Sequence, residues 1–266
     1  NFELAIPDFN RRKLLLEEVK KSNEVVKTTD LLIDAQEQLI KSQYYKTFKQ
    51  ELGIDDDTTY PLRINSTSNV EIKLLKELLL NKPQNGQFVK KGSGGSVDCS
   101  FLNVVDGYVN SYSTEDRREI ISCSQSEFEK YCLKNGDILF NRSSLVKSGI
   151  GWPFLVLNDT KQSTFDCHLI RVNVDPKIIL PEYLYIYALS PWARKYFLCV
   201  GQTTTMTTIS QSEIENFPVP VPSIYKQEEI VTTFSNLFTL RNRFAEHIKF
   251  VSLLSAEYIN KNLKAD

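Results

Sequence analysis

The sequence lacks the features that mark membrane-spanning, secreted and strongly basic proteins. No apolar run reaches the roughly 18 residues that a membrane helix needs, so no membrane span is expected. No basic segment followed by an apolar one opens the chain, so no signal peptide is expected. The 32 lysines and arginines balance 33 aspartates and glutamates, so charge alone does not favour DNA binding and any such surface must be local. These absences favour a cytoplasmic protein.

Cysteine and histidine occur in patterns that favour neither metal binding nor catalysis. The five cysteines are odd in number and have no CxxC spacing, so buried, reduced thiols are expected rather than disulfides or a zinc site. The only histidines are His168 and His247. Because His168 lies in an apolar segment that predicts a strand, Cys167 should point to the opposite face, and the two should not form a dyad. We therefore expect a non-catalytic protein that needs no metal and no cofactor.

Two long amphipathic segments, one near each end, are the most informative feature of the chain. In the first, apolar pairs recur every seven residues, at Val25/Val26, Leu32/Ile33 and Leu39/Ile40. In the second, the seam positions are separated alternately by four and three residues, and most of them are apolar. They are Ile230, Phe234, Leu237, Arg241, Phe244, Ile248, Val251, Ser255, Tyr258 and Asn262. Both patterns are typical of a coiled-coil seam, and two such stripes can bury each other. Helices of about 40 residues are on the order of 60 Å long, which favours a positioning device.

These segments and the sequence between them predict the fold class and the domain boundaries. We expect an α+β fold in which a mixed α/β domain is inserted between two long helices that form an antiparallel coiled coil. Asp8 is a candidate N-cap of the first helix, and Gly53 is a candidate stop. The expected boundaries are a helix at 1–53, a linker at 54–68, the mixed domain at 69–222 and a helix at 223–266.

Within the mixed domain, capping signals and hydrophobic patterns predict the individual elements. Ser124 with Glu127, and Ser210 with Glu213, have the spacing of a capping box and predict helix starts. The segment FPVPVP should be extended, because proline disfavours helix in the residue before it. Helices are predicted at 69–81, 124–133 and 181–199. Strands are predicted at 87–91, 98–105, 119–123, 137–141, 153–157 and 166–174.

Three polar clusters on predicted loops are candidate contacts to nucleic acid. The first contains Asn141 and Arg142, whose side chains can bind base edges in a groove. The second is the threonine-rich run after Gln202, which offers hydroxyls and methyl groups to phosphate and thymine. The third is the GSGGS loop at 92–96, whose backbone N–H groups could hold phosphate. The candidate DNA-contacting residues are Lys90, Lys91, Ser93, Arg142, Ser144, Lys147, Gln202, Thr203 and Thr204.

Each cluster also has a plain structural interpretation. Arg142 could pair with a nearby carboxylate, and the threonine run could be a solvated loop. The glycine loop lacks the Gly-Lys-Ser/Thr ending of a P-loop, and a flexible surface turn is its default interpretation.

Five motifs, in order, resemble the target recognition domain of type I restriction–modification specificity subunits. They are GDILFNRSS (136–144), HLIRV (168–172), PEYLYIYALSP (181–191), TTTMTTIS (203–210) and FPVPVPS…KQEEIV (217–231). In that family alternating prolines and a glutamine precede a long conserved helix, and Pro218, Pro220, Pro222, Gln227 and Ile230 hold those places here. Lys226 stands where the family usually has glutamate. A second conserved helix of the family resembles LLIDAQEQLIKSQYYKTF (31–48), so the resemblance covers about residues 10–260.

The resemblance implies a non-catalytic DNA-recognition module of a restriction–modification system. Subunits of this family carry two recognition domains separated by two conserved helices, and each domain reads half of a split site. With one such domain, the chain is expected to be half a subunit, or the C-terminal specificity part of a fused restriction–methylation enzyme. The implied partners are double-stranded DNA, the methyltransferase (modification) subunit, the restriction subunit and, through the long helices, a second copy in a homodimer.

Two rival functions remain open at the level of the sequence. Pro7-Asp8 and Glu18-Val19-Lys20 spell the PD…ExK pattern of metal-dependent nucleases. A single helix would, however, hold these carboxylates about 15 Å apart, too far to share a metal ion. The other rival is a coiled-coil assembly scaffold whose middle domain binds protein, which would show no preference among DNA sequences.

Overall fold

The chain folds into two compact units, each described by itself. The structure, a computed structural model, describes residues 9–54, 70–89, 94–109, 118–157, 162–203 and 205–264. The helical unit comprises residues 1–43 and 235–266, and the mixed unit comprises residues 44–234. Among the described residues, no helix has the length and apolar character needed to cross a membrane.

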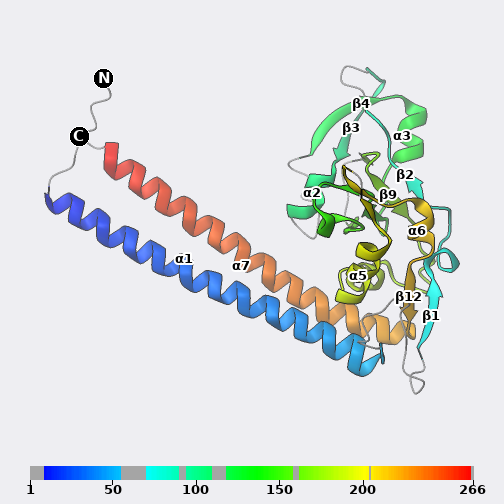
Figure 1. Ribbon diagram of the computed structural model, residues 1–266. Coiled ribbons are helices and arrows are strands. Elements are labelled where there is room, and N and C mark those ends of the chain that lie inside the picture. The colour runs from blue at the N-terminus through cyan, green and yellow to red at the C-terminus, as the bar shows by residue number, and fades with distance from the viewer. Residues whose placement is uncertain are drawn as a thin grey trace. The chain divides into compact units, whose positions relative to one another are not determined.

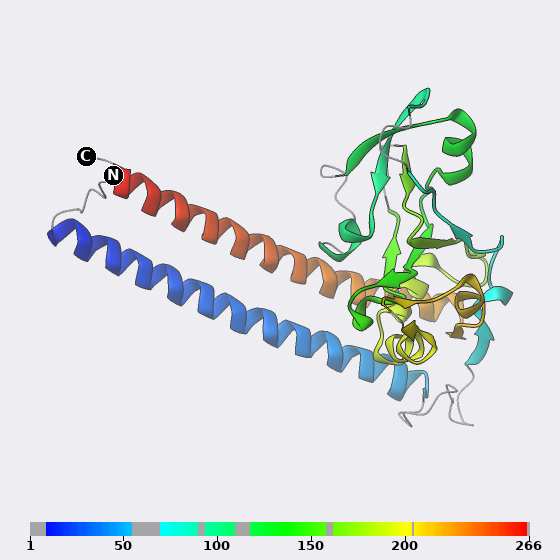
Figure 2. The same cartoon turned by 45° about the horizontal axis from the view of Figure 1, so that its top comes forward.

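The helical unit consists of two long helices that run side by side in opposite directions (Figure 1 and Figure 2). They are most of α1 (Phe9–Tyr44) and most of α7 (Ile224–Lys264). Gln36 of α1 is buried, and its Nε2 atom donates to the backbone carbonyl of Leu237 on α7 at 3.3 Å. The predicted architecture, a mixed α/β segment between two long antiparallel helices, is confirmed.

The buried face of α1 uses one member of each predicted apolar pair. Val26 and Ile33 are half-buried and Ile40 is buried. Because a helix turns by 3.6 residues, two consecutive positions cannot both face the same partner helix. The other members of the pairs are 43, 46 and 51% exposed and form a second apolar line at seven-residue spacing, which we call the outer stripe: Val25, Leu32 and Leu39.

The last turns of the first long helix belong to the mixed unit. α1 passes into a π-helical turn, η1 (Tyr45–Glu51), and Gly53 follows at a φ of 71°. Glycine adopts this left-handed conformation without the steric penalty of a Cβ atom, so the predicted stop at Gly53 is confirmed. Phe48 of η1 is fully buried, with its ring centroid 5.6 Å from that of Tyr187. The predicted N-cap Asp8 lies outside the described residues.

The described strands of the mixed unit form four small sheets. The largest is antiparallel, with the order β2-β9-β5-β7 (Gln84–Asn85, Leu169–Val172, Ile138–Asn141 and Pro153–Leu155). A second has the order β4-β3-β8, with β3 and β8 parallel (Glu119–Cys123, Val97–Leu102 and Ser163–Phe165). The third pairs β1 with β12 (Glu71–Leu74 and Pro218–Val221), as Figure 1 shows. The fourth has the order β10-β11-β6 (Gln202–Thr203, Thr207–Thr208 and Ser143–Ser144).

Short helices connect these sheets. They are α2 (Val104–Val109), α3 (Gln125–Tyr131), α4 (Pro181–Ala188), α5 (Pro191–Val200) and α6 (Gln211–Glu215). Both predicted capping boxes are confirmed, at Ser124 before α3 and at Ser210 before α6. The hydrogen bond from the Ser210 side chain holds the pKa of Glu213 below its usual value, as expected for a carboxylate near a helix N-terminus.

Not every element prediction agrees with the structure. The segment predicted as a helix at 69–81 forms β1 and a 3-10 turn, η2 (Leu75–Glu77), because β12 pairs with Glu71–Leu74. Within the described part of the predicted strand 87–91, only Gln87 forms a bridge, to Asp166. The strand predicted at 166–174 is confirmed for β9, Leu169–Val172, but Cys167 and His168 before it form a turn.

Aromatic rings dominate the core beneath α5. The ring centroid of Phe197 lies 4.7 Å from that of Phe217 and 5.5 Å from that of Phe140, and all three side chains are fully buried. Burial of one such side chain contributes about 1.5–3 kcal/mol. The cluster therefore fixes α5 against β5 and against the segment that leads into β12.

The cysteines are free thiols. Cys99 and Cys123 are buried with their sulfurs 3.7 Å apart, and burial raises the pKa of Cys123 to about 12. Cys132 and Cys167 are half-buried and Cys199 is exposed, so the expectation of buried thiols holds only for Cys99 and Cys123.

Strand β12 depends on two tyrosines, because alternate residues in it are prolines. The strand pairs with β1 along one edge, but Pro218 and Pro220 have no N–H to offer another strand. Their carbonyls accept hydrogen bonds instead, from the hydroxyls of Tyr187 at 3.0 Å and Tyr183 at 2.7 Å on α4. Burial raises the pKa of both tyrosines, which keeps the hydroxyls protonated as donors.

Gln227 joins the proline strand to the start of α7. Its side chain is fully buried, and Oε1 accepts from the backbone N–H of Leu180 at 2.8 Å. Its Nε2 donates to the carbonyls of Ile178 at 3.0 Å and Pro222 at 2.9 Å. One neutral amide thus satisfies three backbone groups that would otherwise lack these partners. The alternation of prolines followed by a glutamine therefore has a structural cause.

The neighbouring Lys226 forms ion pairs with Glu51 at 2.7 Å and Glu229 at 3.1 Å. Partial burial acts to lower the pKa of Lys226, but the hydrogen bonds and charges of the two carboxylates outweigh it and raise the pKa. The lysine at this position therefore has acidic partners from η1 and from its own helix.

Substitution of Gln227 tests this arrangement. Gln227→Ala should lower the free energy of unfolding by about 3 kcal/mol, because it leaves buried backbone groups unpaired and opens a cavity. The exposed neighbour Glu228 provides the control, since Glu228→Ala should change the free energy by no more than about 0.5 kcal/mol. Chemical denaturation of both variants measures the difference, and equal stabilities would contradict the role given to Gln227.

Candidate nucleic-acid interface

The fourth sheet, β10-β11-β6, brings together two of the three candidate clusters. Thr207 pairs with Thr203 on one side and with Ser144 on the other. The hydroxyl oxygens of Thr203 and Thr207 lie 3.0 Å apart. Gln202, Thr203 and Thr208 are exposed, and Ser144 is half-buried. The sheet therefore displays hydroxyl and amide groups, which can bind phosphate oxygens and base edges.

Arg142 lies between β5 and β6 and is held there by its backbone. Its N–H donates to the carbonyl of His168 at 2.8 Å, and its carbonyl accepts from the N–H of Ile209 at 2.9 Å. The side chain is half-buried and forms no ion pair with a carboxylate of the described residues. This part of the chain therefore gives no support to a structural ion pair for Arg142. Lys147, also a candidate, is exposed a few residues further on.

The loop after β6, residues 145–151, is anchored by two side chains from other segments; we call it the tip loop. Arg194 of α5 donates to the carbonyls of Ser148 at 2.9 Å and Gly151 at 2.7 Å, and also to that of Ile150. Asn141 is fully buried, and its Nδ2 donates to the carbonyl of Gly149 at 3.0 Å. The prediction that Asn141 reaches a base edge is wrong, because its side chain anchors the loop instead.

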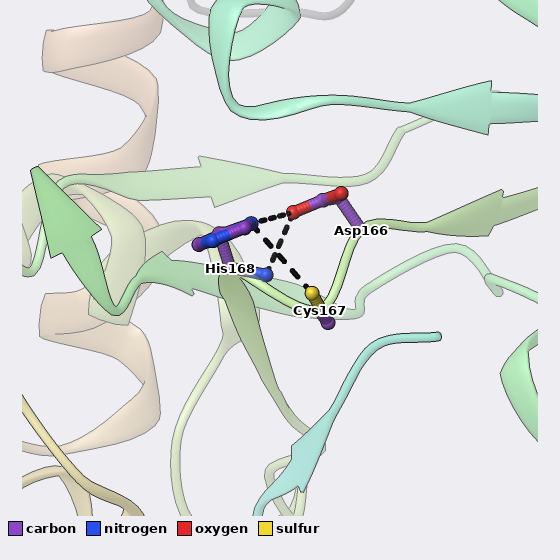
Figure 3. A group of neighbouring side chains, drawn as sticks. All are labelled: Asp166, Cys167 and His168. Atoms are coloured by element: carbon purple, nitrogen blue, oxygen red, sulfur yellow. Dashed lines mark hydrogen bonds and ion pairs between the residues drawn. The ribbon is translucent and has the colours of Figure 1, made fainter. Parts of the chain in front are cut away.

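A turn of three polar residues lies before β9, and Figure 3 shows their side chains. Oδ1 of Asp166 accepts from the backbone N–H of His168 at 2.7 Å and lies 2.7 Å from Nδ1 of the same residue. The sulfur of Cys167 lies 3.6 Å from that nitrogen. The prediction that Cys167 and His168 point to opposite faces of a strand is therefore wrong, because both precede the strand.

This turn has the residue types of a metal site but is better suited to holding the backbone. The possible ligand atoms lie within 4.8 Å of one another. A structural zinc site needs four ligands, however, and Oδ1 of Asp166 already faces two nitrogens of His168. Burial and the Asp166 carboxylate raise the pKa of Cys167, which disfavours the reactive thiolate. Because the backbone N–H of Arg142 donates to the carbonyl of His168, the turn helps to hold the backbone of Arg142 in the candidate interface.

Four of the candidate DNA-contacting residues lie outside the part of the chain that the structure describes, and two structural features of the site, Arg194 and the pair Leu145-Val146, were not predicted. Lys90, Lys91, Ser93 and Thr204 lie outside the described residues. The carboxylate of Glu18 and the amine of Lys20 belong to one helix, α1, while Asp8 lies outside the described residues. No local pattern indicates that Arg194 anchors a loop, whereas Leu145-Val146 is an apolar pair among polar neighbours and could have been recognised in the sequence.

The comparisons with known proteins place the chain in a family. The candidate site is a polar surface on a mixed α/β unit. Residues 81–249 match the family described as the type I restriction modification DNA specificity domain. The match covers more than half of the chain, and the chain belongs to this family.

Individual relatives agree with this assignment. The EcoKI specificity subunit of Escherichia coli K12 is 29% identical over 178 residues, which cover 66% of this chain and 38% of that protein. The EcoBI specificity subunit of Escherichia coli is 28% identical over 78 residues, covering 29% of this chain and 16% of that protein.

Solved structures show the same fold at low sequence identity. One, from work on complex assembly and conformational transition of a type I R-M system, matches with a TM-score of 0.58 and 14% identity, covering 98% of this chain and 61% of that chain. The HsdS subunit from Thermoanaerobacter tengcongensis matches with a TM-score of 0.54 and 13% identity, over 98% and 60% of the two chains. The chain thus spans less than two thirds of the length of these relatives.

The glycine that closes the tip loop provides a test of the anchoring. Gly151 has a φ of 60°, and a Cβ atom there would lie 2.3 Å from the buried ring of Phe197. Gly151→Ala should therefore lower the free energy of unfolding by about 2 kcal/mol or more. Gly94→Ala is the control, since a Cβ atom at Gly94 meets nothing within 4 Å. Thermal unfolding of both variants decides, and a Gly151→Ala protein as stable as the control would contradict this geometry.

Proposed function

We propose that the chain is a non-catalytic DNA sequence-recognition module that reads one half of a split double-stranded site for a type I restriction–modification system. The observation that carries this proposal is the β10-β11-β6 sheet, whose exposed polar side chains lie within the region that matches the family. The methyltransferase and restriction subunits of such a system are the proposed protein partners. The candidate contacts that the structure describes are Arg142, Ser144, Lys147, Gln202 and Thr203.

The charge of the chain indicates how strongly it should bind alone. A net charge of −1 gives little general attraction to phosphate, which supplies most of the sequence-independent affinity for DNA. We therefore expect the methyltransferase subunit to supply part of the affinity, while the candidate sheet supplies the sequence preference. A sequence preference of the chain would distinguish a recognition module from the coiled-coil scaffold, which predicts no preference among DNA sequences.

Selection from a random double-stranded DNA pool tests the proposal. The chain is incubated with the pool at a stated salt concentration, with and without a methyltransferase subunit from the same system, and bound DNA is sequenced. Enrichment of a short motif is the expected result. The proposal fails if no sequence is enriched even with the partner present.

Arg142 can then be assigned to bases or to phosphate. If its guanidinium binds a base edge, Arg142→Ala should weaken binding to the enriched duplex by about 1–3 kcal/mol and relax the preference at one position. Lys82→Ala, at an exposed lysine outside the sheet, should leave binding unchanged. Fluorescence anisotropy with matched and single-mismatch duplexes measures both effects. Equal loss on all duplexes would assign Arg142 to phosphate, and wild-type binding would remove it from the interface.

We also propose that the outer stripe of α1 pairs two copies of the chain. Val25, Leu32 and Leu39 recur at heptad spacing and are exposed, as expected for a seam that another helix covers. A second copy is the favoured occupant, because pairing would bring together two recognition modules, each reading one half of a split site.

The oligomeric state tests this pairing. The wild-type chain should sediment as a dimer, and Leu32→Glu with Leu39→Glu should sediment as a monomer of unchanged helix content, since a buried unpaired charge is costly. Lys41→Glu with Gln38→Glu, at polar exposed positions, is the control for added negative charge. A wild-type monomer at micromolar concentration, or a dimeric double variant, would show that the stripe does not pair two copies.

A further inference from the structure

The tip loop exposes two consecutive aliphatic side chains beside the candidate sheet. Leu145 and Val146 directly follow β6 and are 81% and 66% exposed. Leu145 is more exposed than any other large hydrophobic side chain that the structure describes. A single exposed hydrophobic residue needs no explanation, but an adjacent pair within a short polar loop is less common.

The backbone of the tip loop is fixed although its side chains are not packed. The hydroxyl of Ser144 donates to the carbonyl of Val146 at 2.7 Å and accepts from its N–H at 3.2 Å. The N–H of Gly149 donates to the same carbonyl at 2.8 Å. With Asn141 and Arg194 holding the other end, the loop has side-chain anchors on both sides. A loop fixed in this way loses little conformational entropy when it binds a partner.

The surroundings of the pair fit DNA. Arg142 and Lys147 bracket the loop with positive charge, and neither has a carboxylate partner among the residues that the structure describes. Ser144 and Gln202 add hydrogen-bonding groups on the adjoining sheet. An apolar tip with basic and polar flanks can insert between bases while its flanks bind the phosphates on either side.

We propose that Leu145, supported by Val146, is an apolar wedge that enters the bound duplex and unstacks one base step. This inference rests on the proposed function and deepens it, because it names the group that deforms the DNA. Unstacking costs least at pyrimidine–purine steps, so the wedge favours a TA or CA/TG step at one position of the half-site. Leu145 then contributes to specificity at a step that it reads by deformability and not by hydrogen bonds.

Duplexes with 2-aminopurine report unstacking directly, because the fluorescence of this base rises when it leaves the stack. The probe is the enriched duplex with 2-aminopurine placed at each adenine in turn, bound by the full chain with the methyltransferase subunit where selection required it. The wild-type chain should raise the fluorescence at one step. Leu145→Ala should abolish that rise and weaken binding about tenfold, since Leu145 would no longer bury its side chain. Leu145→Phe should retain the rise, because a larger apolar side chain can still insert.

A matched control and the melting temperature keep the test interpretable. Ile120 is 64% exposed on β4, in another sheet, so Ile120→Ala should leave both fluorescence and affinity unchanged. Because Leu145 is exposed, Leu145→Ala should melt at the wild-type temperature.

Wild-type fluorescence and affinity in Leu145→Ala would overturn the wedge, and so would a bound wild-type complex without a fluorescence rise at any step. Loss of affinity only in the presence of the methyltransferase, without a fluorescence change, would overturn it in favour of a protein contact. A wild-type chain that enriches no sequence would overturn the wedge and the proposed function together.

Discussion

Two tyrosine hydroxyls bound to the carbonyls of a proline strand are the interaction on which the mixed unit depends. Pro218 and Pro220 cannot donate to a further strand, so the tyrosines of α4 complete the free edge of β12. With α4 fixed in this way, Ser190 starts α5 by accepting from the N–H of Ala193. α5 in turn carries Arg194, whose guanidinium holds the tip loop. The position of the candidate interface thus depends on β12, a strand that lies in a different sheet.

The mixed unit separates residues that build the interface from residues that face outward on it. Asn141, Arg194 and Gly151 bind or shape the backbone, and their loss should damage the fold before it changes any preference for DNA. Gln202 and the tip of the loop, Leu145 and Val146, are exposed on that frame. Such a surface can change its side chains without changing its support, which suits the proposed role in DNA sequence recognition. A deforming wedge beside hydrogen-bonding groups would combine two kinds of readout in one small surface.

Local signals in the sequence predicted much of the fold, and long-range pairing accounts for what they missed. The helices begin where the serine–glutamate capping boxes predict, and the proline alternation correctly predicts an extended segment at β12. The helix expected at 69–81 failed because its partner strand lies about 145 residues away in the sequence, beyond the reach of a local pattern. For the same reason, the sequence indicated that Ser144 and Gln202 are polar loop residues but not that one small sheet joins them. The burial of Asn141 could not be predicted either, because the sequence does not distinguish an asparagine that faces solvent at the end of a strand from one that binds a backbone carbonyl.

Hydrogen–deuterium exchange of the chain with and without the enriched duplex tests directly whether DNA binds the β10-β11-β6 sheet and the tip loop. If DNA binds the candidate interface, exchange should slow on DNA binding in two separated segments, the one that contains β6 and the tip loop and the one that contains β10 and β11. The β4-β3-β8 sheet should exchange at the same rate in both states. Protection of β4-β3-β8 with unchanged exchange around Ser144 and Gln202 would contradict the proposed interface, because the DNA would then bind a different face of the mixed unit.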